Sequence, residues 1–188
     1  MRLMSRGITA ALVGVVLLVM GVAGCVKTPV QPPVSTTDAP APVFASDEEA
    51  LAAAEEAYAA YLAVGDEISK QGGDNPERYA QVSKGQALES ALKSAGQFRE
   101  ARAHTFGDST YSTYKLQLAN YANVETLEIL VYVCDDVSSV DVLGEDGVSI
   151  VSPDRPDKTP FVVEFDHKLN NKLILSRKDL WEGETFCD

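Results

Sequence analysis

The hydrophobic pattern of this chain changes its period once, near residue 105, and this change limits the folds that the chain can adopt. From residue 46 to about residue 103, apolar residues recur every three or four positions, as on one face of a helix. From about residue 109 to 180, they alternate with polar residues or form short apolar runs, as in strands. This order predicts an α+β domain, with helices packed on one face of a largely antiparallel sheet.

Three helices are expected in the first part. Ser46 and Glu49 match a capping box, and the first helix extends to about Lys70. Its apolar stripe, which either packs in the core or lines a pocket, consists of Leu51, Ala54, Tyr58, Tyr61 and Leu62. Pro76 suits the first position of a second, short helix. The third extends over about 84–103, and its expected buried side consists of Ala87, Leu88, Ala91, Leu92, Ala95 and Phe98.

Strands are expected in the second part. The predicted segments are residues 109–120, 124–135, 138–143, 148–151, 161–169 and 172–180. The second segment is apolar on both faces in Leu130–Val133, so we expect it at the centre of the sheet. Gly144–Gly147 predicts a turn, Asn170-Asn171 predicts a tight hairpin, and the prolines of 152–160 predict a loop.

Residues 1–24 have the organisation of a bacterial secretory signal, with Arg2 and Arg6 before an uncharged apolar run. The run is shorter than the roughly 20 apolar residues of a transmembrane span. The run ends in Val22-Ala23-Gly24-Cys25, which resembles the lipobox of bacterial prolipoproteins. The resemblance implies cleavage before Cys25 and a diacylglycerol on its sulfur, with palmitate among the acyl chains. Two acyl chains would anchor the exported protein stably at the outer face of the cytoplasmic membrane.

Residues 25–45 are predicted to form a tether with no core. They hold five of the nine prolines of the chain, and proline-rich segments act as extended, semi-rigid spacers. Residues 46–188 then form one domain of ordinary size.

The mature chain is strongly acidic. The only charges in residues 1–24 are two arginines, so 14 basic and 28 acidic residues remain, a net charge of −14. Such a surface repels phosphates, which argues against nucleic acid as a partner. A metal site at Asp135, Asp136, Asp141, Glu145 and Asp146 is not expected, since the spacing of a calcium loop is absent. No cofactor is expected either.

Two cysteines remain once Cys25 carries lipid, and they are Cys134 and Cys187. An even pair in an exported protein indicates a disulfide. A zinc site would need more ligands than this pair and the two histidines of the chain offer. On the chain-entropy account, a bond of this span would stabilise the fold by roughly 4 kcal/mol.

Several short motifs in residues 46–188 resemble the NTF2-like (SnoaL-like) domains of actinobacterial lipoproteins. They are Pro76–Ala80, Cys134–Val142, Gly147, Trp181–Glu184 and Cys187. The resemblance implies a cone of three helices and a strongly curved sheet with an internal cavity. It also implies the Cys134–Cys187 bond, and it brings no established activity. The sequence departs from such domains at Leu173–Leu175, where a tryptophan is often found.

Catalytic candidates are few. His167 shares a strand face with Phe161, Val163 and Phe165, so it is either a cavity residue for proton transfer or a histidine at the rim beside the hairpin. His104 is expected at the end of the third helix, in a capping role. The sequence therefore favours a non-catalytic envelope lipoprotein that binds a small apolar ligand or a protein partner at the membrane face. The alternatives are a SnoaL-like cavity enzyme that uses His167 with a carboxylate, and a purely structural spacer.

Overall fold

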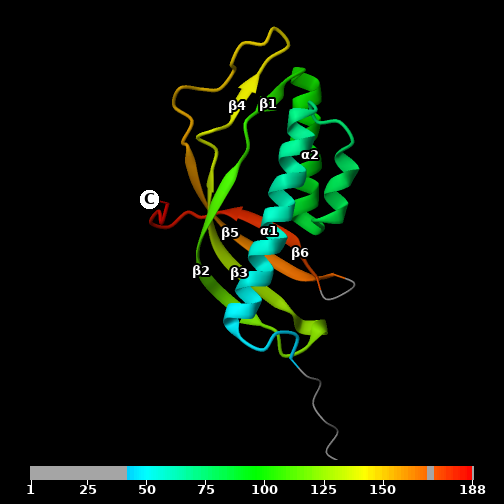
Figure 1. The fold of residues 1–188 in the computed structure, drawn as a ribbon, viewed down its shortest axis with the longest axis vertical. Coiled ribbons are helices and arrows are strands. Elements are labelled where there is room, and N and C mark those ends of the chain that lie inside the picture. Colours follow the sequence, from blue (N-terminus) through cyan, green and yellow to red (C-terminus); the bar gives the residue numbers. More distant parts are fainter. Residues whose placement is uncertain (1–41, 169–171, 188) are drawn as a thin grey trace, which may run out of the picture. The chain divides into compact units, whose positions relative to one another are not determined.

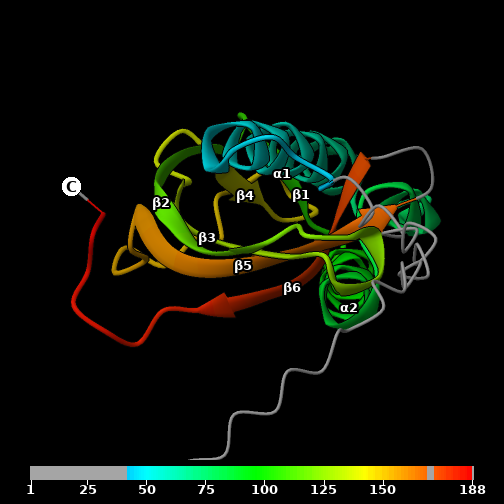
Figure 2. The same ribbon diagram turned by 90° about the horizontal axis from the view of Figure 1, so that it is seen from below.

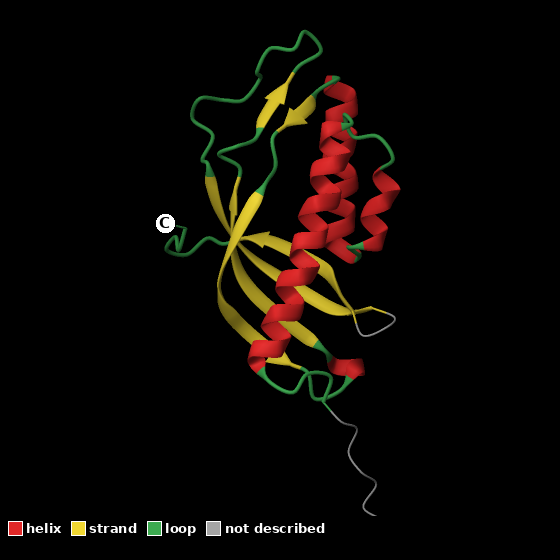
Figure 3. Cartoon of the chain, viewed as in Figure 1, coloured by secondary structure: helices red, strands yellow, loops and turns green. Residues whose placement is uncertain are grey.

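The computed structural model describes residues 42–168 and 172–187, and in them the two α-helices precede an antiparallel sheet, which is consistent with the expected α+β class (Figures 1 and 3). The helical elements are α1 (Asp47–Lys70), the 3-10 helices η1 (Pro76–Gln81) and η2 (Val124–Thr126), and α2 (Gly85–Ala101). The strands are β1 (His104–Phe106), β2 (Thr110–Asn120), β3 (Glu128–Asp136), β4 (Asp141–Leu143), β5 (Lys158–Lys168) and β6 (Lys172–Leu180).

The main sheet has four antiparallel strands in the order β2-β3-β5-β6. β3 lies inside it, between β2 and β5, which confirms the central position expected from its apolar run. The sheet is curved, and α1 lies along its concave face (Figure 2). The outer edge of β6 is covered by the segment between η1 and α2, which pairs in parallel at Ser83 and Leu175. β1 and β4 form a separate two-stranded sheet.

The first helix begins and ends as the sequence indicates. Ser46 is its N-cap, and the Ser46 hydroxyl accepts a hydrogen bond from the backbone of Glu49 at 3.3 Å. Tyr58 is almost fully buried, so the aromatic stripe of α1 belongs to the core. The core between α1 and the sheet contains Phe44, Ala50, Ala54, Tyr58, Ala87, Leu127, Ile129, Val131, Val133, Val163, Phe165, Leu173 and Leu175. Ile68, Tyr79, Ala91 and Ala95 form a smaller cluster between the helices.

The third helix ends earlier than its hydrophobic pattern predicts, and the capping role of His104 is wrong. α2 stops at Ala101 because Arg102 adopts a left-handed conformation with φ 49°. His104 then begins β1, where it pairs with Leu143 of β4 and is exposed. Leu92, which we expected on the buried side of this helix, is also exposed.

Three strand boundaries differ from the predictions. β3 begins at Glu128, because the side chain of Asn123 accepts hydrogen bonds from two backbone amides and holds residues 124–126 in a turn. β4 is limited to Asp141–Leu143, and residues 148–150 pair back onto it through the predicted turn. β5 starts at Lys158, inside the expected loop, since Pro160 lies opposite Cys134 on an antiparallel partner. The predicted Asn170-Asn171 hairpin and Leu169 lie outside the described residues.

The domain begins before residue 46, so the expectation of a tether without a core is wrong at its end. Phe44 is buried and meets the ring of Tyr121 edge to face at 6.1 Å. The backbone amide of Val43 donates to the carbonyl oxygen of Tyr121 at 2.9 Å. These contacts fix the point where the chain enters the domain.

A disulfide joins Cys134 and Cys187, and their Cα atoms are 5.5 Å apart. The bond connects the end of the central strand to the C-terminal segment across 53 residues. It therefore closes a loop that contains β4, β5 and β6.

Candidate functional site

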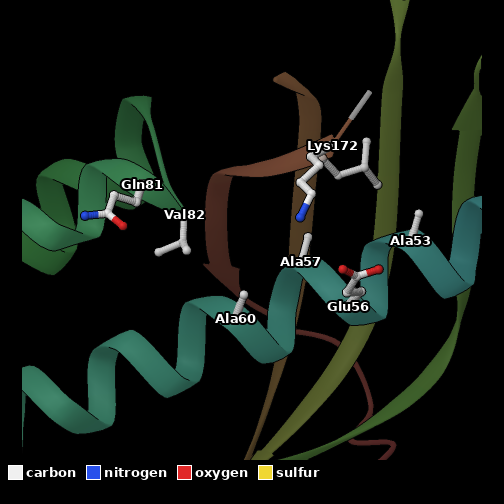
Figure 4. A pocket seen from close by; sticks show the side chains of 8 residues that line it. Ala53, Glu56, Ala57, Ala60, Gln81, Val82 and Lys172 are labelled. Carbon is white, nitrogen blue, oxygen red and sulfur yellow. The ribbon is translucent and has the colours of Figure 1, made fainter. Parts of the chain in front are cut away.

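A groove lies between α1, the end of η1 and the start of β6, with a volume of about 350 Å³ (Figure 4). We call it the alanine groove. Its lining residues are Ala53, Glu56, Ala57, Ala60, Gln81, Val82, Lys172 and Leu173. Small-molecule sites in proteins typically start near this volume.

The groove exists because three alanines of α1 face the end of η1 and the start of β6 there, with Glu56 as the one longer α1 side chain in the lining. Ala53, Ala57 and Ala60 recur at helical spacing and so share one face of α1. An alanine side chain ends at Cβ, which leaves space between the helix and the elements opposite. Val82 and Leu173 complete an apolar lining.

Polar groups of both signs lie at the mouth of the groove. Figure 4 shows the carboxylate of Glu56 and the ammonium of Lys172 at the hollow, on opposite walls. Within the described part of the chain, no ion pair involves either residue. An apolar lining with charged groups at its mouth suits a ligand that is partly apolar and partly polar.

A second polar site is buried under α1. The hydroxyl of Tyr58 donates to one oxygen of the Asp135 carboxylate at 2.7 Å, and the ammonium of Lys178 donates to the other at 2.5 Å. The carboxylate comes from β3, the ammonium from β6 and the hydroxyl from α1. We call these three residues the Asp135 network. It ties the helix to two strands of the sheet.

Aromatic rings surround the Lys178 ammonium. Its nitrogen is 4.2 Å from the ring centre of Phe161, 5.6 Å from that of Tyr58 and 5.9 Å from that of Tyr61. Burial raises the pKa of the Tyr58 hydroxyl well above its ordinary value, and the charge of Asp135 adds to this effect. Burial likewise raises the pKa of Tyr61. Both tyrosines therefore stay neutral over the physiological pH range.

The Asp135 network stabilises the fold rather than forming a reactive site. Both carboxylate oxygens have a strong donor, and Asp135 is only 7% exposed. A buried carboxylate whose partners all come from the protein has little capacity left to act on a substrate.

The sequence pattern did not predict the Asp135 network, although it indicates that one member, Asp135, points toward the core. Ile129, Val131 and Val133 alternate toward the core, and the same alternation brings Asp135 inward. The partner was hidden by a register shift between β5 and β6 at Glu164 and Phe165. A simple alternation from Leu173 and Leu175 would point Arg177 inward. The shift puts Lys178 there instead, opposite the buried Val163.

His167 lies on β5 opposite Leu173 and is half-buried. Val163 and Phe165 on the same strand are fully buried, so this face of the strand points toward the core as expected. Leu173 lines the alanine groove, whereas His167 is not among the lining residues. Its role as a cavity residue therefore stays a prediction.

The acidic residues considered for metal binding do not converge. Asp135 is buried in its network, whereas Glu145 pairs with Arg102 at 2.8 Å on the surface. Asp141 and Asp146 accept hydrogen bonds from residues of their own turn. In residues 42–168 and 172–187, no group of three or more potential ligands is close enough to hold a metal ion.

The predicted lipidation site, Cys25, lies outside the described residues. Among the helices that the structure describes, none has the length and apolar content of a membrane-spanning helix.

Comparison with known proteins gives no family. No protein-family model and no curated protein matches the chain. Among solved structures, the chain is similar to the crystal structure of the intermembrane space region of the chloroplast protein ARC6. The two share 12% identity with a TM-score of 0.49, over 69% of this chain and 95% of that chain. A similarity at this level does not extend to function.

Proposed function

We propose that this chain is an exported envelope lipoprotein, anchored through a diacylglycerol on Cys25, whose domain binds a small amphipathic ligand without catalysing a reaction. The observation that carries the proposal is the alanine groove, with its apolar lining and its charged residues of opposite sign. The sequence supports the anchor, through the lipobox-like Val22–Cys25.

We also propose that the domain has the NTF2-like architecture. The support is the curved antiparallel sheet with α1 along its concave face, preceded in the chain by helices (Figure 2). In this arrangement the groove is the opening between the helices and the sheet.

The register of β5 argues against an enzyme that combines His167 with Asp135. Asp135 lies opposite Thr159 at one end of β5, and His167 is eight positions further along the strand. At about 3.3 Å per residue, the two residues are roughly 26 Å apart. A general base must lie within about 3 Å of the proton that it takes, so the two groups would not serve one reaction centre.

Binding of 8-anilinonaphthalene-1-sulfonate tests the groove. This probe combines aromatic rings with one anionic group, and its fluorescence rises in an apolar site. We expect saturable binding by the wild type and loss of binding in Ala60→Trp, because the indole would fill the groove. Ala60 is exposed, so this substitution leaves the core intact.

Ala52→Trp is the matched control, since Ala52 is exposed on the same helix and does not line the groove. It should bind the probe as the wild type does. Equal binding by Ala60→Trp and the wild type would exclude the groove as the ligand site.

A further inference from the structure

Cys134 and Asp135 follow one another on the central strand, so their side chains point to opposite faces of the sheet. Asp135 points inward and joins its network with Lys178. Cys134 points outward, on the same face as Tyr132, and is bonded to Cys187. The end of β3 is thus held from both faces, on the inside by a β6 side chain and on the outside by the segment that follows β6.

This following segment, residues 181–187, contacts the outer face of the sheet, and we call it the C-terminal clasp (the red trace between β6 and the C label in Figure 2). Trp181 and Phe186 contact the same ring, that of Tyr132, with ring centres 5.0 Å and 5.5 Å away. The backbone amide of Trp181 donates to the carbonyl oxygen of Pro160 at 2.9 Å. The clasp therefore contacts the outer face of the sheet at Tyr132 of the central strand β3.

The clasp has a folded shape of its own. The indole N–H of Trp181 donates to the carbonyl oxygen of Glu184 at 3.0 Å, which closes a turn. Gly183 lies under this indole, and a Cβ at that position would come within 2.5 Å of ring carbons. The amide of Cys187 donates to the hydroxyl of Thr185 at 3.2 Å, just before the disulfide.

The contacts of the clasp with the sheet are at its two ends. Trp181 and Phe186 contact the Tyr132 ring, and the Trp181 amide donates to Pro160. Between them, Glu182, Gly183, Glu184 and Thr185 are exposed and bury little apolar surface, although docking orders their backbone as well. The disulfide adds to these contacts, because it keeps the end of the clasp beside β3.

We propose that the Cys134–Cys187 disulfide is a redox-controlled lock, opened by a dithiol of the thiol–disulfide oxidoreductase class. A thiolate of the dithiol attacks the Cys187 sulfur, because Cys187 is half-buried whereas Cys134 is only 3% exposed. The Cys134 thiolate leaves and takes a proton. The second thiolate of the dithiol then displaces Cys187, so the dithiol is oxidised to a disulfide and both cysteines become thiols.

Opening the lock releases the clasp and exposes the ring of Tyr132. Val162 lies opposite Tyr132 on β5, and Leu130 lies two positions away on the same face of β3. These residues form an aromatic and apolar surface at the centre of the sheet. The Asp135 network lies on the other face and keeps α1 and β6 in place. The released state therefore keeps these contacts, and the Tyr132 ring is uncovered on the outer face of the sheet.

Trp181 is the only tryptophan of the chain, so its fluorescence reports the clasp directly. The experiment treats the purified full chain with dithiothreitol, a dithiol, and follows the emission maximum and acrylamide quenching of Trp181. Far-UV circular dichroism follows the fold, and alkylation with peptide mapping follows the thiols of Cys134 and Cys187. We expect a shift to longer wavelength and stronger quenching with an unchanged dichroism spectrum.

The Cys187→Ser variant is the matched control. It should show the shifted emission and stronger quenching without reductant, and dithiothreitol should not change either. The proposal is overturned if Trp181 is unaffected when both thiols are free, because the clasp then stays docked unaided. Loss of the far-UV signal on reduction, or resistance of the native bond to dithiothreitol, would overturn it as well.

Discussion

Replacing Lys178 by methionine tests the Asp135 network. Methionine keeps most of the length and apolar volume of the lysine side chain and removes its charge. Asp135 then stays buried with Tyr58 as its remaining donor. Removing one partner of a buried ion pair costs about 3–5 kcal/mol, and the lower figure applies because the Lys178 side chain is 19% exposed.

This cost converts into a change of melting temperature. The domain spans residues 43–188, so its entropy of unfolding is about 0.3 kcal/mol/K at roughly 2.1 cal/mol/K per residue. A loss of about 3 kcal/mol therefore lowers Tm by about 10 °C. Thermal unfolding of the purified protein, followed by circular dichroism, measures the shift.

Lys84→Met is the matched control. Lys84 pairs with Asp166 at 2.8 Å, but their side chains are 44% and 33% exposed. A surface pair of this kind contributes at most about 1 kcal/mol, so Tm should fall by about 3 °C or less. Equal shifts for Lys178→Met and Lys84→Met would refute the view that burial makes the Asp135 network important. In Asp135→Asn/Lys178→Met, the loss should be smaller than the sum of the single losses.

The remaining predictions concern pH, backbone and anchor. Burial raises the pKa of Tyr58 and of Tyr61, so folding favours their neutral forms. The protein should therefore keep its full stability below pH 10, the ordinary tyrosine pKa, and lose stability as the pH rises further. Absorbance at 295 nm should show these two hydroxyls ionising only when the protein unfolds. Gly107→Ala should lower the free energy of unfolding by about 3 kcal/mol or more, because φ is 94° and a Cβ would collide with a backbone carbonyl oxygen. Gly147→Ala should lower it by about 1 kcal/mol, because φ is 75° but the space around the position is open. Denaturant unfolding measures both changes. Cys25→Ser should abolish palmitate labelling and remove the protein from the membrane fraction, and unchanged labelling would contradict the predicted anchor.

The hydrophobic pattern predicts the long elements of this fold because each depends mainly on its own residues. α1 has a capping residue, a continuous stripe and a glycine stop, and β3 has an apolar run that only a central strand buries on both sides. The short strands β1 and β4 have three residues each and exist through pairing with one another. The turn before β1 depends on Arg102 in a left-handed conformation, which the sequence does not announce because glycine usually occupies such positions.

The candidate sites, like the short strands, depend on tertiary contacts that the sequence pattern does not show. The alanines of α1 are visible in the sequence, but the groove requires η1 and β6 to stand opposite them, which is a property of the tertiary structure. The Asp135 network depends on one extra residue at Ser176 of β6, which selects Lys178 over Arg177 for the inner face. A register shift of this kind is set by contacts between strands, so local alternation alone predicts the wrong side chain.

Native mass spectrometry of the protein released from its own membranes reports the anchor and the ligand together. We expect a mature chain that begins at a diacylated Cys25 and carries a small ligand at one site. The ligand should accompany the wild type and Ala52→Trp, and be absent from Ala60→Trp. An unmodified Cys25 would contradict the anchor, and a ligand-free wild type, or equal occupancy in Ala60→Trp, would contradict binding in the alanine groove.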